Sequence, residues 1–263
     1  MTYLPTSTLL VAAIGLLACG GEQTAEAPAA PSDAITTQGV SVTPKVSGTD
    51  FPDAHLTNFA YEDGTFTYGY EADTYQLGAQ TPDAASTMCA NSAKGQHIHL
   101  IVDNEPYIAK YEPTFEQEIA DGQHRILTFL SRSYHESIKS PQAHRAVMAD
   151  VSDGAFASQE PITEPMLFYS RPKGTYVGKD AESVLLDFYP VNVELGADYA
   201  VKVEVGGFTT TLDAWQPYVI EGLPMGENTV TLTLVDGEGK RVEAPLNPVS
   251  RSFTLQADPM PGE

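Results

Sequence analysis

The sequence predicts an all-β protein: two tandem immunoglobulin-like β-sandwich domains that follow a signal peptide and a flexible tether. From Phe51 onward, short runs of alternating apolar and polar residues, rich in β-branched and aromatic side chains, are separated by turn signals such as Asp63-Gly64 and Asp236-Gly237. No long helical period appears anywhere. The strand-like segments of the first half of this region also match those of the second half in sequence and order. A sandwich follows because two antiparallel sheets bury their alternating faces against each other.

The N-terminal part of the chain differs in composition from the rest. An apolar run from Leu9 to Ala18 is too short to span a bilayer as a mature helix, and it suits the apolar region of a signal peptide. We therefore expect residues 1–18 to be a targeting segment. Residues 19–45 are rich in Ala, Pro, Thr, Ser and Gly and poor in aromatic residues, so they lack the apolar surface needed to fold. This composition predicts a flexible tether.

The end of the apolar run, Leu16-Leu17-Ala18-Cys19-Gly20, resembles the lipobox of bacterial lipoproteins. In that motif small residues precede a cysteine that is lipidated and becomes the new N-terminus. The resemblance implies that acyl chains on Cys19 anchor the protein stably to a membrane. Because residue 20 is Gly rather than Asp, it also implies the outer membrane of the cell envelope, and it leaves the periplasmic or surface face open.

Two portions of the chain can be aligned with each other over three matched segments. In order, YQLGA (75–79), YEPTF (111–115) and ADGQHRILTFL (120–130) match VELGA (193–197), WQPYV (215–219) and PMGENTVTLTL (224–234). The order is the same in both portions, which indicates a tandem repeat of one β-domain. We place the repeats at 51–152 and 165–257. The intervening segment, 152–165, is expected to be a linker, because it has two prolines and little apolar content.

Repeat one carries residues that repeat two lacks. After its LGA segment it inserts Gln80–Gln96, which contains Met88 and Cys89 and leads into a strand with His97 and His99. The aligned repeat two contains no histidine or cysteine at all. Residues that serve only the fold should recur in type at matched places, so this asymmetry is the main functional signal in the sequence.

The chemistry of these residues is that of transition-metal ligands. Residues i and i+2 on a strand point to the same face about 7 Å apart, so His97 and His99 can converge on one ion. A third ligand would come from His124, His135 or Cys89. Cys89 and Met88 are soft ligands and would favour copper, whereas three histidines alone would suit zinc or copper. The alternative is that the histidines and Cys89 are packing residues.

Composition and missing motifs narrow the function classes. The chain has 14 Lys and Arg against 35 Asp and Glu, a formal charge of −21, which argues against nucleic-acid binding. It has no Gly-x-Ser-x-Gly elbow, Gly-rich phosphate loop or His-Glu-x-x-His motif, so we expect no enzymatic activity. Three interpretations remain: a metal-binding envelope lipoprotein, a protein-interaction or assembly module whose envelope partner docks at Gln80–Gln96, and a structural stalk.

Two further resemblances concern the mature chain. Repeat one resembles an uncharacterised family of small exported bacterial domains, through a pattern formed here by His97, His99, Asp103, Gly122, His124 and His135. The mature chain resembles lipoproteins of Bacteroidota in the stretches CANSAKGQHIHLI, FLSRSYHES, LFYSRPKG and IEGLPMGEN. Those relatives are sometimes labelled phosphopeptide-binding, but the sequence shows no basic cluster or Arg-rich phosphate pocket. These resemblances imply the fold and the envelope location rather than an activity.

Overall fold

The computed structural model describes residues 39–87 and 89–259. The predicted signal peptide, the lipidation site Cys19 and the tether up to residue 38 lie outside the described residues. The described part is built of seventeen strands and two short 3-10 helices, which confirms the predicted all-β class. No helix in this part is long and apolar enough to cross a membrane.

The first sandwich consists of a three-stranded and a five-stranded sheet, with strand orders β2-β3-β6 and β5-β4-β7-β8-β9. Its strands are β2 (His55–Glu62), β3 (Thr65–Glu71), β4 (His97–Val102), β5 (Ile108–Lys110), β6 (Thr114–Glu116), β7 (Gly122–Ser131), β8 (His144–Ser152) and β9 (Ala155–Pro161). A short helix, η1 (Ala84–Ser86), lies between β3 and β4. Alternate residues such as Leu56, Phe66, Ile98 and Leu100 fill the core between the sheets.

The second sandwich has strand orders β1-β15-β12-β10 and β11-β17-β16-β13-β14. Its strands are β1 (Ser41–Pro44), β10 (Met166–Arg171), β11 (Gly174–Val177), β12 (Ser183–Val191), β13 (Tyr199–Val205), β14 (Phe208–Leu212), β15 (Tyr218–Glu221), β16 (Gly226–Asp236) and β17 (Val249–Gln256), with η2 (Gly178–Ala181) after β11. Val201, Val203, Leu232 and Leu234 are fully buried in its core, as period-2 alternation requires.

The two sandwiches share one immunoglobulin-like strand order. Apart from the edge strands β1, β9 and β11, each sandwich has seven strands. The first, second and fifth of these form one sheet (β2-β3-β6 and β10-β12-β15), and the third, fourth, sixth and seventh form the other (β4, β5, β7, β8 and β13, β14, β16, β17). Strand β4 begins at His97 and β13 at Tyr199, while β7 and β16 both begin at a glycine, Gly122 and Gly226. The histidines of β4 therefore stand on a strand that the second sandwich also has.

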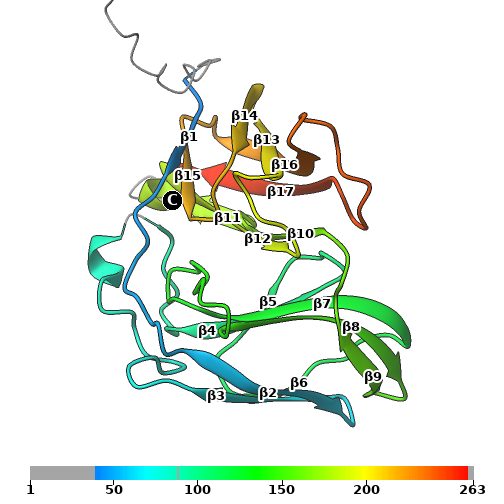
Figure 1. Cartoon of the computed structure of the whole chain (residues 1–263). Coiled ribbons are helices and arrows are strands. Elements are labelled where there is room, and N and C mark those ends of the chain that lie inside the picture. The colour runs from blue at the N-terminus through cyan, green and yellow to red at the C-terminus, as the bar shows by residue number, and fades with distance from the viewer. Residues whose placement is uncertain (1–38, 88, 260–263) are drawn as a thin grey trace, which may run out of the picture. The chain divides into compact units, whose positions relative to one another are not determined.

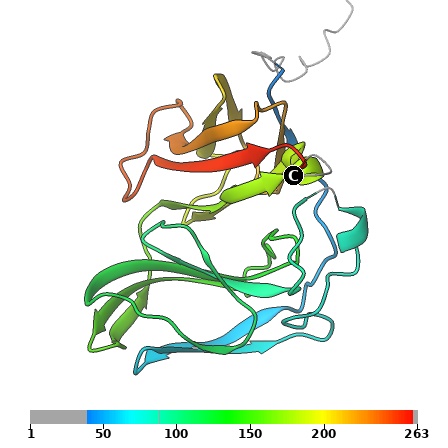
Figure 2. The ribbon, with the colours of Figure 1, turned by 180° about the vertical axis from the view of Figure 1, so that it is seen from behind.

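The described residues, 39–87 and 89–259, nevertheless belong to one compact unit, so the predicted count of two domains is not confirmed. In Figures 1 and 2 the sheet that contains β4 and β7 lies between β2-β3-β6 and the strands β10 and β12. Residues on its outer face, Leu127 and Phe129, share an apolar cluster with Phe168 and Tyr189 of β10 and β12. We call this cluster the junction.

Two predicted boundaries are wrong. The predicted tether, 19–45, includes strand β1, which pairs with β15 of the second sandwich. Val40 is buried in the second core and Val42 packs against it, so two apolar residues and backbone pairing suffice to add an edge strand although the surrounding composition is loop-like. The predicted linker, 152–165, contains β9, which pairs with β8 through backbone hydrogen bonds that do not require apolar side chains.

Candidate metal centre

Strand β4 presents two histidines on the face that looks toward the junction. Ile98 and Leu100 point into the first core. His97 and His99 therefore lie on the opposite face with Ile101, which belongs to the junction cluster. Both imidazoles have no exposed surface. Burying two polar rings in an apolar layer is costly unless their nitrogens find partners.

The third histidine comes from the turn that follows β7. Strand β7 ends at Ser131, which pairs with His97 across the sheet. The chain then reverses tightly, with His135 N–H donating to the Arg132 carbonyl at 3.0 Å and Arg132 N–H donating to the Glu136 carbonyl at 2.9 Å. His135 has φ +68°, a left-handed conformation that is uncommon outside glycine. The turn brings the ring of His135 against that of His97, with centroids 4.7 Å apart.

The three imidazoles converge on one point. His97 Nε2 lies 2.8 Å from His99 Nε2 and 2.9 Å from His135 Nδ1. The three candidate ligand atoms all lie within 4.8 Å of one another. Nitrogens bound at 2.0–2.1 Å to a tetrahedral ion are about 3.3 Å apart. The two distances from His97 are shorter than this by a few tenths of an ångström, and the nitrogens of His99 and His135 would also have to take this spacing around an ion.

A backbone carbonyl fixes the orientation of His97. Its Nδ1 lies 2.8 Å from the carbonyl oxygen of Gly95, and a carbonyl oxygen can only accept. Nδ1 is therefore the protonated nitrogen, and the lone pair of Nε2 points at His99 and His135. Metal-binding histidines are usually held in this way by a second hydrogen bond.

Burial lowers the pKa of all three imidazoles. The pKa of His97 falls from its usual 6.5 to about 4, and those of His99 and His135 lie well below 6.5. Desolvation is the largest cause, and the positive charges of Arg171 and Lys173 act in the same direction. The rings are therefore neutral at pH 7, which is the form that binds metal ions.

Tyr107, in the loop between β4 and β5, encloses the cluster. Its ring stacks on that of His99 with centroids 3.6 Å apart and an interplanar angle of 7°. Its hydroxyl lies 3.2 Å from His135 Nδ1. Two basic residues of the second sandwich contact the ring of Tyr107. Lys173 Nζ lies 3.8 Å and Arg171 Cζ lies 5.4 Å from the ring centroid. The site is thus built by residues of both sandwiches.

His124 does not belong to this cluster. It stands near the start of β7, whereas the cluster lies beside Ser131 at the end of that strand. Seven residues of strand separate them, or about 23 Å. His124 Nδ1 instead lies 2.6 Å from the Asp103 carboxylate, and its Nε2 lies 2.8 Å from the Ala120 carbonyl. The prediction of His124 as a ligand is wrong because the antiparallel pairing carries it to the far end of the sheet.

Cys89 also stands apart from the three imidazoles. It is buried in a small cluster with Tyr134 and Leu185, and it is not among the groups that converge with His97. Burial raises the pKa of its thiol to about 11. At neutral pH it therefore remains a protonated thiol in an apolar setting, as expected of a packing residue.

The described parts of the insertion, 80–87 and 89–96, are folded against the His135 turn. Ser92 N–H donates to the Ser133 carbonyl at 2.8 Å, and Ser133 N–H donates to Thr81 Oγ1 at 2.9 Å. The hydroxyl of Tyr134 donates to the Asp83 carboxylate at 3.2 Å. The segment expected to be an exposed docking loop therefore holds the turn that carries a site residue.

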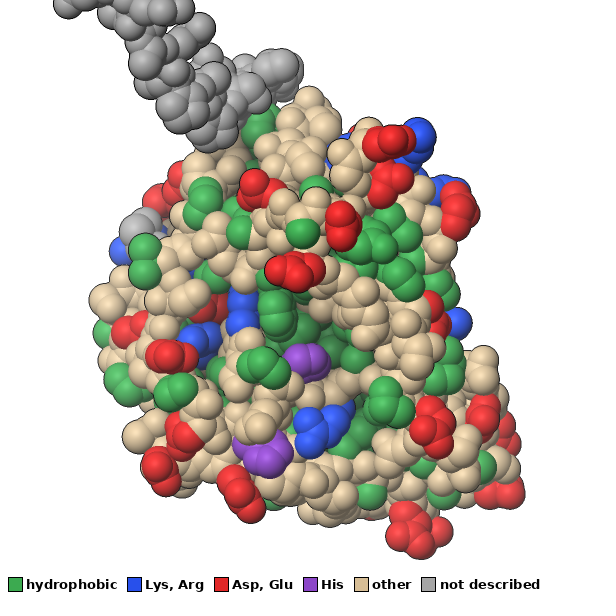
Figure 3. All heavy atoms as spheres, viewed as in Figure 1, with side chains coloured by type: hydrophobic (Ala, Val, Ile, Leu, Met, Phe, Trp, Pro, Cys, Tyr) green, Lys and Arg blue, Asp and Glu red, His purple; other side chains and the backbone are tan. Residues whose placement is uncertain are grey.

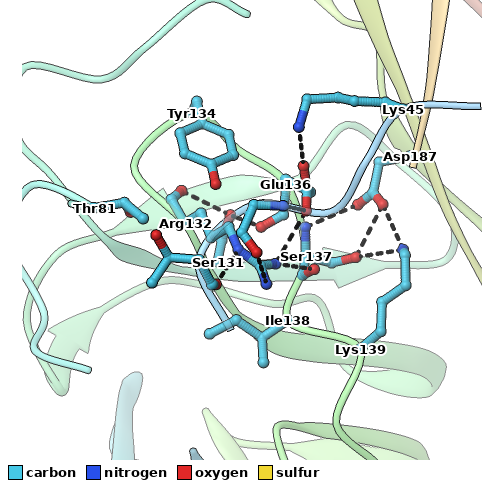
Figure 4. A network of polar contacts seen from close by, with 12 residues as sticks. Lys45, Thr81, Ser131, Arg132, Tyr134, Glu136, Ser137, Ile138, Lys139 and Asp187 are labelled. Atoms are coloured by element: carbon cyan, nitrogen blue, oxygen red, sulfur yellow. Dashed lines mark hydrogen bonds and ion pairs between the residues drawn. The ribbon is translucent and has the colours of Figure 1, made fainter. Parts of the chain in front are cut away.

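Buried charges tie the same turn to the second sandwich (Figure 4). The Glu136 side chain is fully buried and pairs with Lys45 at 2.7 Å and with Arg132 at 3.3 Å. Ser137 Oγ and Lys139 Nζ donate to Asp187 Oδ1 at 2.9 and 2.8 Å. Sequence reasoning missed these residues. The one available signal was the density of charged and polar residues around His135.

Comparison with known proteins identifies no relative by sequence. No protein-family model and no curated protein matches the chain. Among solved structures, the fibronectin(III)-like modules of Clostridium thermocellum CbhA are 13% identical, with 36% of this chain and 100% of that chain covered and a TM-score of 0.28. A Ca²⁺-stabilised adhesin with which an Antarctic bacterium binds ice is 13% identical, with 86% and 50% covered and a TM-score of 0.25.

A third solved structure is the Bacteroides ovatus mixed-linkage glucan utilisation protein SGBP-B, which is 8% identical. The match covers 84% of this chain and 71% of that one, with a TM-score of 0.20. Similarities at these TM-scores carry no argument about function. The assignment of an immunoglobulin-like fold therefore rests on the strand order of the two sandwiches themselves.

Proposed function

We propose that this protein is a non-enzymatic metal-binding module of the bacterial cell envelope that holds one copper or zinc ion through His97, His99 and His135. The observation that carries the proposal is the convergence of three neutral imidazole nitrogens within 4.8 Å. Two of these rings have no exposed surface, and a bound ion would replace the contacts that their nitrogens now make with one another.

The ligand chemistry selects the class of ion. Three imidazole nitrogens suit zinc and copper, whereas calcium and magnesium require oxygen ligands. The thiol of Cys89 lies outside the ligand set, so the preference for copper that a soft ligand would give is removed. Three protein ligands leave a further coordination position open, as in zinc sites that exchange a water or another ligand.

The proposal places the module at a membrane through Cys19. Its support is the lipobox resemblance of residues 16–20 together with the composition of the residues that follow. Radiolabelled palmitate should be incorporated into the wild-type chain in a bacterial host and not into Cys19→Ser, whereas equal labelling of both chains would exclude lipidation at this residue.

The metal site is tested on the full-length chain purified in detergent. After incubation with Cu²⁺ or Zn²⁺ and removal of loosely bound ions, elemental analysis should find about one ion per chain in the wild type. The double variant His97→Ala plus His99→Ala should lose it, since two of three ligands are gone. His124→Ala is the matched control, because this histidine lies at the other end of β7, and it should keep the full content.

Two outcomes would contradict the proposal. One is a wild-type chain that retains no ion and whose unfolding temperature is unchanged by added metal, because an ion that binds only the folded state must stabilise it. The other is a His124→Ala chain that loses the ion while the double variant retains it.

A further inference from the structure

Two basic residues beside the histidine cluster have no acidic partner. Arg171 is 7% exposed, its Nη1 donates to the Tyr176 hydroxyl at 2.7 Å, and its buried Nε has no hydrogen-bond partner. The Asp187 carboxylate on the neighbouring strand already accepts from Lys139 and Ser137. Among the described residues, neither Arg171 nor Lys173 forms an ion pair.

This absence is unusual for a chain with a formal charge of −21. Acidic side chains are spread over the face shown in Figure 3, and they outnumber the basic ones. Arg171 and Lys173 nevertheless both lie against Tyr107, which also contacts His99 and His135, and Lys173 Nζ donates to the Tyr107 carbonyl at 2.6 Å. The excess of acidic residues therefore supplies no countercharge for these two cations.

A metal ion would increase this imbalance. Three neutral imidazoles add no negative charge, so an ion among them would add its positive charge to those of Arg171 and Lys173 in a poorly solvated region. An anion bound to the open coordination position would offset part of this positive charge. The Tyr107 hydroxyl, 3.2 Å from His135 Nδ1, is placed to donate a hydrogen bond to it.

We propose that the histidine cluster binds its ion together with a small exogenous anion that occupies the open coordination position and is attracted by Arg171 and Lys173. This inference rests on the proposed metal-binding function and names the second ligand of the same site. His97 and His99 have no exposed surface, so the proposal is restricted to small anions such as chloride, azide or a simple carboxylate.

Azide is the probe, since its binding to Cu²⁺ gives a ligand-to-metal charge-transfer absorption. The full-length, copper-loaded chain in chloride-free buffer is titrated with sodium azide. In the wild type, the charge-transfer absorption should grow with the azide concentration until it saturates. Lys173→Met and Arg171→Gln should each weaken azide binding roughly 10- to 100-fold, the size expected for loss of one nearby charge.

A second readout separates a charge effect from a structural one. Without added anion, both variants should bind Cu²⁺ as tightly as the wild type or more tightly, because a positive charge that opposed the ion is removed. Lys202→Met is the matched control, since Lys202 pairs with Glu204 on the surface at 2.9 Å, and it should leave both affinities unchanged. Lys173 is only partly buried, so Lys173→Met is expected to fold and can carry the test alone if Arg171→Gln does not fold.

The possible failures are distinguishable. If copper loads but azide produces no band, or if Lys173→Met binds azide as tightly as the wild type, the anion inference is overturned and the metal site stands. If the wild type does not load copper or zinc at all, the proposed function itself fails.

Discussion

At the scale of single residues, the surroundings of each histidine decide what it can do. His97 has one nitrogen fixed by a carbonyl and the other turned toward two imidazoles. His124 has both nitrogens occupied, by a carboxylate and a carbonyl. One ion bound by all three rings could replace the contacts of His97 with the other two imidazoles, whereas His124 is not among the groups that converge, although both residues lie on strands of the same sheet.

Burial of the histidine cluster makes the stability of the metal-free protein depend on pH. The folded-state pKa of His97 is about 4, against about 6.5 in an unfolded chain, and those of His99 and His135 are also lowered. Between pH 6.5 and 4 the unfolded state binds more protons, so the free energy of unfolding falls as the pH decreases through this window. His97 alone contributes on the order of 3 kcal/mol to this loss.

Urea denaturation in EDTA at pH 7 and pH 4.5 measures this loss. The variant His97→Gln plus His99→Gln plus His135→Gln should show a clearly smaller loss of stability between the two pH values, because the carboxylates common to both chains contribute equally. Equal losses in the two chains would show that the cluster titrates normally.

At the scale of elements, the site depends on one turn and on the loop that precedes β4. Gly95 has φ +86°, and a Cβ at this position would lie 2.4 Å from the Gly78 carbonyl oxygen. Only glycine permits this close approach, and the Gly95 carbonyl then fixes the His97 ring. The His135 turn is held by the insertion on one side and by Glu136 with Lys45 and Arg132 on the other.

Glu136→Gln should destabilise the protein by about 3–5 kcal/mol, because it leaves the charges of Lys45 and Arg132 without their buried partner. Urea denaturation at pH 7 measures the change. Glu238→Gln is the control, since its pair with Lys240 is exposed and should contribute less than about 1 kcal/mol. A Glu136→Gln variant as stable as this control would mean that the turn does not depend on the buried network.

At the scale of the whole described unit, the junction joins the two sandwiches and completes the site. Its apolar cluster takes residues from β4 and β7 on one side and from β10 and β12 on the other. Asn104, in the β4–β5 turn, accepts from Tyr169 N–H at 2.8 Å and donates to the Leu167 carbonyl at 2.9 Å. Tyr107 of the first sandwich meets Arg171 and Lys173 of the second at the same place.

The junction should make both sandwiches unfold together. In a Cys19→Ser background, urea should expose Cys89 to thiol labelling and change the fluorescence of Trp215 over the same concentration range, since Cys89 lies in the insertion of the first sandwich and Trp215 between β14 and β15 of the second. Phe168→Ala should lower the common midpoint, with a loss of about 3–5 kcal/mol. Met225→Ala, at an exposed residue, is the control. Two separate transitions in the wild type would show that the sandwiches are independent.

Much of the fold could be predicted because its causes are local. Alternation with period 2 marks the faces of each strand, and the repeated segments place the same strands in both sandwiches. Strands β1 and β9 were missed because a short edge strand needs only a few suitable residues and backbone pairing. The average composition of the surrounding segment is loop-like and conceals such a short strand.

The candidate site could be predicted only in part. Spacing alone placed His97 and His99 on one face, because the strand period fixes it. Spacing could not show whether His135 or His124 is the third residue of the cluster, because the answer depends on which end of β7 lies beside His97.

The sequence by itself thus determined the all-β class, the duplicated strand pattern and the shared face of the two β4 histidines, because each follows from periodicity along a short stretch of chain. The tertiary structure alone decided that His135, 38 residues from His97, completes the cluster. It also brought Tyr107, Arg171 and Lys173 to it. These contacts arise from antiparallel register, a left-handed turn and the packing of one sandwich on the other, and no local pattern encodes them.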